Sequence, residues 1–403
     1  MYTILRTRLD GMKDEIRDFL TRLIETPSPS TKEKRIADLV YVEMENLGFD
    51  KVYRDEAGNV IGVINGIEGA PTVVLNSHLD SVGCENTEPF RARCVGDRIY
   101  GAGASDCKGG LAAQVYTGEI LKRCLLPLKG NLVVAATVAE ENGCSVGVRM
   151  LLKETLPSLG LKPDYVILGE PTNLGLYYGH DGRVEFDIKL EGRDPFQVDD
   201  GARNIYREFA GNNPRHEEVD FQGLASFEPE LSSSGGWRHA RIHMEKKLHP
   251  DDSPEAVTEH FKHEAGLLLK TQKALALETM VVEERQKLFC GRKILVKHLV
   301  NAWQTDPFNP LMERARQSLA AAACEVKTGK WKLARPGMGT AGGMIRSEYG
   351  LPVIGYGPGE EEEAHTSNES VDFNKVSECV YGSASIVHGL IGIPVFGWTS
   401  DEI

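Results

Sequence analysis

Short apolar runs that end in a histidine or an acidic residue recur along this 403-residue chain, and they constrain its fold more than any other feature. Such runs are typical of buried strands, and strands that alternate with helices indicate a layered α/β domain. The expected strands are 59–65, 72–76, 132–137, 165–168 and 353–356. Helices are expected at about 8–25, 33–47, 108–124, 145–155, 310–324 and 373–390.

The segment from 182 to 298 has a different pattern. Two runs of alternating apolar and polar residues, Arg183–Leu190 and Ala240–Met244, flank a polar irregular stretch, and a helical pattern begins at about residue 253. Strands followed by a helix inside an α/β chain predict an inserted α+β domain. We therefore expect the insertion 182–298 to separate two parts of one α/β domain, 1–181 and 299–403.

Charge and composition exclude several classes of function. The net charge of −13, from 46 basic and 59 acidic residues, argues against a nucleic-acid surface, and the acidic run Glu360–Glu363 is typical of a solvated loop. No apolar stretch approaches the roughly 20 residues that span a bilayer, and the N-terminal residues lack a signal-peptide core. We expect a cytoplasmic protein whose eight cysteines, which form no CxxC pair, are reduced thiols.

The run 72–76 leads into His78-Leu-Asp80, where two polar side chains stand two residues apart. Residues two apart on a strand point to the same face. The pair is either a surface turn with a hydrogen-bonded histidine, or a metal ligand whose second ring nitrogen is held by a carboxylate. Taken alone, such a pair is more often a turn, so the rest of the chain must decide.

Histidines and carboxylates also follow the other expected strands. In an open α/β sheet, ligand sites lie beyond the carboxyl ends of the strands. Residues from five strand ends therefore point to one place, and this coincidence favours a site over a set of unrelated surface loops. The candidate residues are His78, Asp80, Asp106, Glu140, Glu141, Glu170 and His365.

Asp106 lies in the glycine-rich segment Gly101–Gly110. Gly101-x-Gly103 resembles the start of a dinucleotide-binding loop, but Asp106 occupies the position of the third glycine, where an acid would repel a pyrophosphate. The spacing of a P-loop is also absent. The glycines more plausibly let the backbone turn tightly, so that Asp106 can reach a metal.

Two histidines and three carboxylates without a thiolate suit two Zn²⁺ ions, or Mn²⁺ or Co²⁺, better than a structural zinc site. If one carboxylate bridges two ions, each ion keeps a histidine, a carboxylate and an open position, as in two-metal hydrolysis with ions about 3.5–4 Å apart. The adjacent Glu140 and Glu141 fit this scheme, because one can bind metal while the other accepts a proton from the attacking water.

These motifs, in this order, resemble the M20 family of metallopeptidases and deacylases. That family includes acetylornithine deacetylase, succinyl-diaminopimelate desuccinylase and carboxypeptidase G2. The similarity covers about residues 10–180 and 299–392, and around Gly329–Trp331 and Gly357–Gly359 it is closest to the acetylornithine-deacetylase-like branch. The resemblance implies a three-layer αβα catalytic domain of the zinc-exopeptidase type, with an inserted ferredoxin-like α+β domain that serves as a lid and dimerisation domain.

The resemblance also implies a role for each candidate residue. His78 and Glu170 would hold one ion, Glu141 and His365 the other, and Asp106 would bridge them. Asp80 would orient His78, and Glu140 would be the general base and acid. The family often has a cis peptide after the bridging aspartate, so Asp106–Cys107 is expected to be cis. The implied cofactor is a pair of divalent ions, with Zn²⁺ the first choice, and the implied assembly is a homodimer through the lid domain.

The lid departs from the family pattern. Phe196 falls where relatives carry a histidine that stabilises the oxyanion in the partner subunit's site, and the segment is shortened. Loss of one such donor costs about 10²–10³ in rate. The lid arginine that binds a substrate carboxylate is replaced within Met244–Lys247, and lysine lacks its bidentate fork. Possible substitutes for the lid histidine are His180, His239 and His243, although each is more often a surface or packing residue.

Three hypotheses therefore remain. The first is an active amidohydrolase that cleaves the amide bond of a small N-acyl amino acid or short peptide, with no nucleic-acid or membrane partner. The second is a metal-binding scaffold with weak or no turnover, because the lid histidine is missing. The third, a sensor or interaction protein that uses the fold without metal, is disfavoured by the intact set of ligands.

Overall fold

The computed structural model describes residues 1–82, 90–142, 145–210, 225–226, 229–270, 275–333 and 338–394. The chain forms two compact units. The first comprises Met1–His180, Gln286–Ile294 and Gln304–Ile403, and the second comprises Asp181–Arg285 and Leu295–Trp303. Residues 286–294 thus group with the first unit, although they lie within the predicted insertion. Among the described helices, none is both long and apolar enough to cross a membrane.

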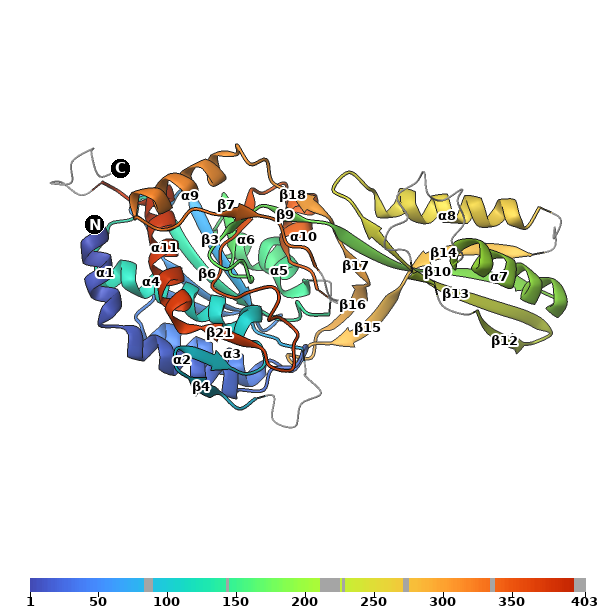
Figure 1. Cartoon of the computed structure of the whole chain (residues 1–403), viewed down its shortest axis with the longest axis horizontal. Coiled ribbons are helices and arrows are strands. Elements are labelled where there is room, and N and C mark those ends of the chain that lie inside the picture. The colour runs from blue at the N-terminus through green and yellow to red at the C-terminus, as the bar shows by residue number, and fades with distance from the viewer. Residues whose placement is uncertain are drawn as a thin grey trace. The chain divides into compact units, whose positions relative to one another are not determined.

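The first unit is built on an eight-stranded sheet with the order β1-β2-β6-β3-β7-β20-β8-β19, seen near the centre of that unit in Figure 1. The strands are β1 (Lys51–Arg54), β2 (Val60–Ile64), β3 (Thr72–His78), β6 (Asn131–Thr137), β7 (Tyr165–Leu168), β8 (Leu176–Tyr177), β19 (Thr328–Gly329) and β20 (Val353–Gly355). All five strands predicted from apolar runs are therefore present. The predicted α/β class with an inserted α+β unit is confirmed.

The four central strands end at one edge of this sheet. β6, β3, β7 and β20 are parallel neighbours, so their carboxyl ends align. His78, the last residue of β3, lies beside Thr137, the last residue of β6, and Gly355 of β20 lies beside Leu168 of β7. Every residue of β3 and β6 is buried, as expected for continuous apolar runs in a parallel sheet.

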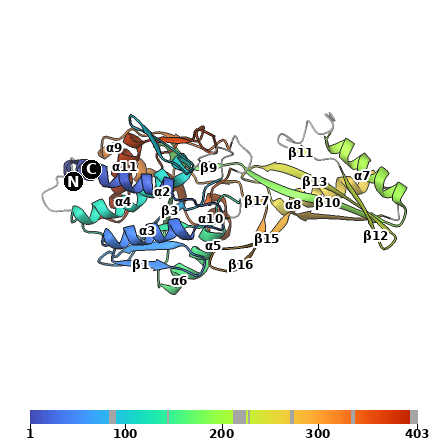
Figure 2. The same ribbon diagram turned by 90° about the horizontal axis from the view of Figure 1, so that it is seen from below.

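Helices pack against this sheet (Figure 2). α4 is buried along almost its whole length and contacts α11, α2 and β3, while α3 packs on β1 and β2. The helix expected at 8–25 is two helices, because the chain turns at Gly11. The helix expected at 145–155 is interrupted by a π-helical turn at Leu151–Thr155, and α10 was not predicted. The helices are α1 (Tyr2–Asp10), α2 (Lys13–Glu25), α3 (Lys34–Asn46), α4 (Gly109–Arg123), α5 (Val146–Met150), α6 (Leu156–Ser158), α9 (Pro310–Ala321), α10 (Gly342–Tyr349) and α11 (Phe373–Ile391).

Smaller sheets complete the first unit. One has the order β21-β5-β4, and a two-stranded sheet pairs β18 with β9. A two-stranded sheet of β15 and β16 includes residues assigned to both units. The strands are β4 (Arg93–Val95), β5 (Arg98–Tyr100), β9 (Gly179–His180), β15 (Glu283–Lys287), β16 (Lys293–Lys297), β18 (Trp303–Gln304) and β21 (Ser370–Asp372). Cys84 and Cys144 lie outside the described residues, and the six described cysteines are free thiols.

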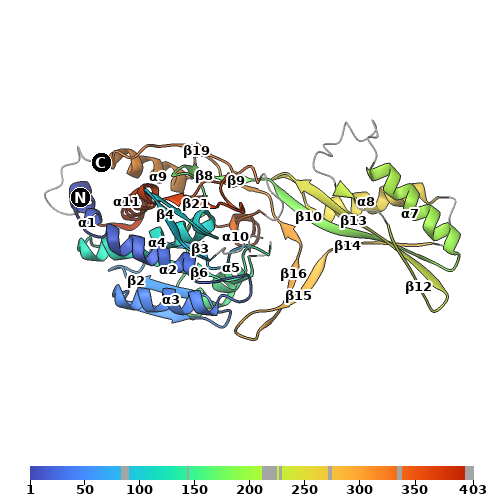
Figure 3. The ribbon, with the colours of Figure 1, turned by 60° about the horizontal axis from the view of Figure 1, so that its bottom comes forward.

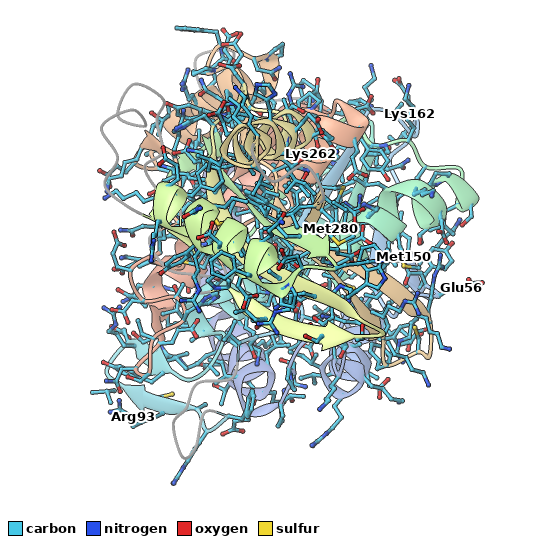
Figure 4. All side chains as sticks on the ribbon, turned by 90° about the vertical axis from the view of Figure 1, so that its right-hand side faces the viewer. Glu56, Arg93, Met150, Lys162, Lys262 and Met280 are labelled. Carbon is cyan, nitrogen blue, oxygen red and sulfur yellow. The ribbon has the colours of Figure 1, made fainter. Side chains whose placement is uncertain are left out.

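The second unit is an antiparallel sheet with two helices (Figure 3). Its core joins apolar residues of β10 and β13 to those of α7 and α8. The opposite side of the sheet carries polar residues and the exposed Met280, which Figure 4 labels together with Lys262 of α8. The elements are β10 (Gly182–Gly192), α7 (Pro195–Ala210), β11 (Ala225–Ser226), β12 (Glu230–Ser234), β13 (Trp237–Leu248), α8 (Pro254–Leu268), β14 (Ala276–Val281) and β17 (Leu299–Val300).

Candidate metal centre

The seven candidate residues all belong to the first unit, and they come together at the carboxyl edge of its central sheet. His78 ends β3, Glu140 and Glu141 follow β6, and Glu170 follows β7. Asp106 arises differently from the prediction, because the strand before it, β5, belongs to a small sheet. It lies in a π-helical turn, Ala104–Lys108, that precedes α4. His365 also comes from a turn well beyond the end of β20, so only three of the expected strand ends supply their residues directly.

Asp106 lies between the two histidines. Its Oδ1 atom is 3.1 Å from His78 Nε2, and its Oδ2 atom is 3.4 Å from His365 Nε2. Glu170 Oε2 lies 3.8 Å from His78 Nε2, and Glu141 Oε2 lies 2.9 Å from His365 Nε2. The potential donors thus form two groups that share Asp106, each with its donor atoms within 4.8 Å of one another. The peptide bond between Asp106 and Cys107 is cis, as expected.

Two buried polar atoms of the described residues at this centre have no hydrogen-bond partner. His365 Nε2 and Glu141 Oε1 are both buried in this way, and the 2.9 Å approach of His365 to Glu141 lacks the alignment of a hydrogen bond. Buried polar atoms are nearly always satisfied in folded proteins. Imidazole and carboxylate donors are the ligands that Zn²⁺, Mn²⁺ and Co²⁺ accept. The residues present therefore fit a pair of divalent cations.

Cys107 is an addition to the predicted donor set. Its Sγ atom falls within the group of donors around His78. The thiol accepts a hydrogen bond from the backbone N–H of His78 at 3.2 Å, and burial raises its pKa well above the ordinary value. Cys107 thus supports the end of β3 as a protonated thiol, which is consistent with a centre built from nitrogen and oxygen ligands.

Without cations, the two histidines carry the positive charge of the centre. Burial opposes the charged form of His78, but Glu170 and Asp106 raise its pKa well above the ordinary value. Burial likewise opposes the charge on His365, whereas Asp106 and Glu141 raise its pKa to about 11. For Asp106 the balance is reversed, because the two histidines overcome burial and hold its pKa below the ordinary value. In the metal-free centre, protons on the two histidines therefore supply the positive charge that metal ions would otherwise supply.

Glu140 is placed to exchange a proton. It is 7% exposed, and burial is the main cause that raises its pKa to about 8; His78 opposes this shift, and Glu141, Asp80 and Asp106 add to it. Ser145 Oγ donates a hydrogen bond to Glu140 Oε1 at 3.3 Å. A carboxyl group with a pKa near neutrality is suited to general base and acid catalysis.

Asp80 contacts His78 through a different atom from the one predicted. His78 Nδ1 donates to the backbone carbonyl of Asp80 at 2.8 Å, while the Asp80 carboxylate lies 3.6 Å from the same nitrogen. The carboxylate instead accepts the backbone N–H groups of Glu140 at 3.1 Å and Glu141 at 3.0 Å, and the hydroxyl of Ser30 at 2.7 Å. Asp80 therefore joins the turn after β3 to the turn after β6.

Sequence reasoning missed three buried charged residues near the centre. Glu33 accepts the backbone N–H of Ala139 at 3.0 Å, and burial together with Asp80 raises its pKa to about 7. Burial lowers the pKa of Lys108 to about 8, opposed by Glu369 and Asp80. Glu369 accepts backbone N–H groups of the Asp106 turn. Glu369 stands four residues after His365, and that short spacing was the only signal in the sequence.

The residues considered above for the roles of the lid histidine and the lid arginine have the following surroundings. Phe196 lies in the first turn of α7 and is 79% exposed. Met244 belongs to the apolar core of the second unit, and Lys247 Nζ pairs with Asp181 at 2.7 Å. The three histidines each contact a neighbour: His180 with Thr340, His239 with Glu191 and His243 with Asp187.

A profile of peptidase family M20/M25/M40 matches residues 74–389. The uncharacterized protein YgeY of Escherichia coli K12 is 29% identical and is covered over 96% of its length by 95% of this chain. The LysW-lysine hydrolase of Deinococcus radiodurans is 26% identical, with 93% of this chain and 97% of that protein aligned. Carboxypeptidase G2 of Pseudomonas sp. strain RS-16 is 34% identical over 162 residues, which are 38% of this chain and 37% of that protein.

Two solved structures share the fold. YxeP of Bacillus subtilis, described as a dinuclear metal-binding peptidase of the M20 family, has a TM-score of 0.69 at 15% identity and covers 94% of this chain and 98% of its own. The dipeptidase Dug1p of Saccharomyces cerevisiae has a TM-score of 0.68 at 14% identity, over 97% of this chain and 98% of its own. At these identities the similarity establishes the fold alone.

Proposed function

The chain belongs to peptidase family M20/M25/M40 and is a hydrolase of amide or peptide bonds, and from this we propose that it is a two-metal amidohydrolase acting on small N-acyl amino acids or short peptides. The observation that carries the proposal is the position of Asp106, with one carboxylate oxygen toward His78 and the other toward His365. Such a carboxylate is placed to bridge two cations.

We assign the metal ligands as the resemblance implied. His78 and Glu170 would hold one ion, Glu141 and His365 would hold the other, and Asp106 would bridge them. When bound, the two divalent ions, for which we propose Zn²⁺ first and Co²⁺ or Mn²⁺ next, polarise the substrate carbonyl and lower the pKa of a water molecule. The unpartnered atoms Glu141 Oε1 and His365 Nε2 support this assignment.

Glu140 is the proposed general base and acid. Its carboxylate takes a proton from the attacking water and returns it to the nitrogen of the leaving amine, so that the amide C–N bond breaks without an unstable amide anion leaving. The hydroxyl of Ser145 holds one carboxylate oxygen, and the backbone of Glu140 is held by Asp80. Both contacts restrict Glu140 to one orientation, which supports efficient proton transfer.

We propose the substrate class from the names of the similar proteins. A LysW-lysine hydrolase, a carboxypeptidase and a dipeptidase are named among the similar proteins. All three names are compatible with cleavage of an amide next to an amino acid.

We also propose a homodimer through the second unit, whose β14 is an edge strand. A monomer mass in light scattering at micromolar concentration would exclude the dimer.

A second candidate function rests on Phe196. Its side chain is exposed and supplies no hydrogen-bond donor where relatives have the lid histidine, so a metal-binding scaffold with weak turnover is the alternative. A panel of N-acyl amino acids and dipeptides, assayed with added Zn²⁺, Co²⁺ or Mn²⁺, tests both candidates. Turnover of a panel member supports the amidohydrolase. Two bound ions without turnover on any member supports the scaffold, and failure to bind ions excludes both.

A further inference from the structure

We propose that Glu369 is a positioning residue of the metal centre: its carboxylate holds the turn that carries Asp106 and thereby sets both oxygens of the bridging ligand. This inference rests on the proposed two-metal function. Glu369 does not contact a reacting atom in the proposal. It acts through the backbone of the residues around Asp106.

The hydrogen bonds of Glu369 surround Asp106. Glu369 Oε2 accepts the backbone N–H of Gly103 at 2.8 Å, and Oε1 accepts the N–H groups of Ser105 and Asp106, each at 2.9 Å. The backbone carbonyl of Glu369 accepts a fourth bond, from the N–H of Gly101 at 3.0 Å. The residue is 4% exposed, so these bonds form away from water, where hydrogen bonds are strong.

The turn that carries Asp106 requires an acceptor for its backbone N–H groups. Asp106 and Cys107 have non-helical backbone angles, which interrupt the regular hydrogen bonding before α4. The turn also passes through Gly103 at φ +80°, where a side chain would be strained and would press on Lys108 at 3.0 Å. Without the Glu369 carboxylate, the N–H groups of Gly103, Ser105 and Asp106 would be buried and unsatisfied, at a cost of about 1–3 kcal/mol each.

Glu369 also connects Asp106 to the segment that carries His365. Ser105 Oγ donates to the carbonyl of Glu360 at 2.8 Å and accepts the N–H of Glu360 at 2.8 Å. Immediately after Glu369, β21 pairs with β5. The two stretches are distant in sequence but are joined by bonds on both sides of His365. A displacement of Glu369 would therefore disturb the separation of Asp106 from His365 as well as from His78.

A purely structural role is the alternative explanation, because a buried carboxylate that accepts three N–H groups stabilises any fold. The two explanations differ in what they predict for metal binding. A structural residue lowers the melting temperature of the metal-free protein and leaves the affinity of the folded protein for metal unchanged. Loss of a residue that positions a bridging ligand weakens the binding of both ions together, because Asp106 would bridge them.

Glu369→Gln is the sharpest test. Glutamine keeps the length of the side chain and one carbonyl oxygen, but its NH₂ group must face one of the N–H groups that the carboxylate accepted. We expect the dissociation constants of both Zn²⁺ ions to rise by about 10–100-fold, the usual effect of removing a partner that orients a ligand. Competition with a chromophoric chelator at fixed pH measures both constants without any substrate.

Asp164→Asn is the matched control. Asp164 Oδ2 accepts the backbone N–H of Thr72 at 2.7 Å, at the start of β3, whereas His78 lies at the end of that strand. The control weakens one partly buried bond between a carboxylate and the backbone, at the opposite end of β3 from His78. We expect it to lower the melting temperature of the metal-free protein and to leave both metal affinities at the parental value.

Glu369→Asp covers the case in which Glu369→Gln does not fold. Aspartate keeps the charge but is one methylene shorter, so it cannot reach all three N–H groups, and an intermediate loss of affinity is expected. A folded Glu369 variant with parental affinity for both ions overturns the inference while the two-metal function stands. A parental protein that binds no ions overturns both.

Discussion

The backbone carbonyl of Asp80, and not its carboxylate, accepts the hydrogen bond from His78 Nδ1. This relationship leaves the carboxylate free to accept the backbone N–H groups of Glu140 and Glu141. One residue thus fixes the tautomer of a proposed metal ligand through its main chain and the position of the proposed base through its side chain. The two tasks are separable by mutation.

Asp80→Asn tests this separation. Asparagine keeps the carbonyl contact to His78, so we expect two bound ions per chain, as in the parent. It replaces one acceptor oxygen by an NH₂ group that faces a backbone N–H, so we expect the turnover number to fall by about 10–100-fold. Metal content by plasma spectrometry, beside kinetics on a substrate found in the panel, checks both expectations. Loss of an ion from the folded variant would show that the carboxylate supports His78 after all.

Glu140→Gln should abolish proton transfer and spare the metal centre. Glutamine keeps the shape of the side chain and the contact to Ser145 but cannot accept a proton. We expect a turnover number lower by about 10²–10⁴, the usual range for a general base, with two ions still bound. Glu140→Ala should be similarly inactive. A Glu140→Gln protein that turns over near the parental rate would contradict the proposed mechanism.

Glu141→Ala should lose metal, in contrast to the Glu140 variants. Its carboxylate lies 2.9 Å from His365 Nε2 and has one unpartnered oxygen, so its removal takes a terminal ligand from one ion. We expect the variant to retain one ion tightly and to lose the other on dialysis. Equal metal loss from the Glu140 and Glu141 variants would contradict the division of roles between these neighbours.

Metal binding should release at least two protons per chain at pH 7, one from each histidine, and a further one from Glu170, because burial raises the pKa of that carboxyl well above the ordinary value. His365 has its pKa raised to about 11 and His78 has its pKa raised well above the ordinary value, so both are protonated before metal binds. Each must lose its proton to become a ligand, and metal affinity therefore rises with pH. Calorimetric titration with Zn²⁺ in two buffers of different ionisation enthalpy measures the number. The variant His365→Ala should release about one proton fewer, and parental heats that do not depend on the buffer would contradict the prediction.

Glu33→Gln should change how the stability of the metal-free protein depends on pH. The pKa of Glu33 is raised from an ordinary 4.5 to about 7, mainly by burial and then by Asp80. Between these values the folded state binds more protons than the unfolded state, so the free energy of unfolding falls as pH rises, by up to about 3 kcal/mol in total. Glutamine has no proton to lose and keeps an acceptor for the N–H groups of Thr31 and Ala139.

The variant should therefore be more stable than the parent above pH 7, and this advantage should vanish below pH 4.5. Urea denaturation of both proteins, with chelator present, at pH 4.5, 6 and 8 measures the difference. A constant difference across this range would show that Glu33 does not hold its proton in the folded state. The comparison of two proteins at each pH cancels the contributions of other titrating groups.

Much of the first unit was predictable from the sequence. β3, β6 and β7 were found because continuous apolar runs are the signature of strands buried on both faces of a sheet. Their following residues could be placed near one another because parallel strands end at the same edge. The helix α7 was missed, although Val198, Ala202, Ile205 and Phe209 follow a helical spacing and are buried in the core of the second unit. Polar residues between them had suggested an irregular stretch.

The chemical groups of the candidate site and their order along the chain can be read directly from the sequence: His78, Asp106, Glu140, Glu141, Glu170 and His365. The contacts that hold these groups in place became visible only in the folded chain. The Asp80 carboxylate bonds the backbone after β6, and the Glu369 carboxylate bonds the backbone around Asp106. The physical reason is that these acceptors are satisfied by main-chain N–H groups. Every residue except proline carries such a group, so the partner of a buried carboxylate has no signature in the sequence and is selected only when distant segments pack together.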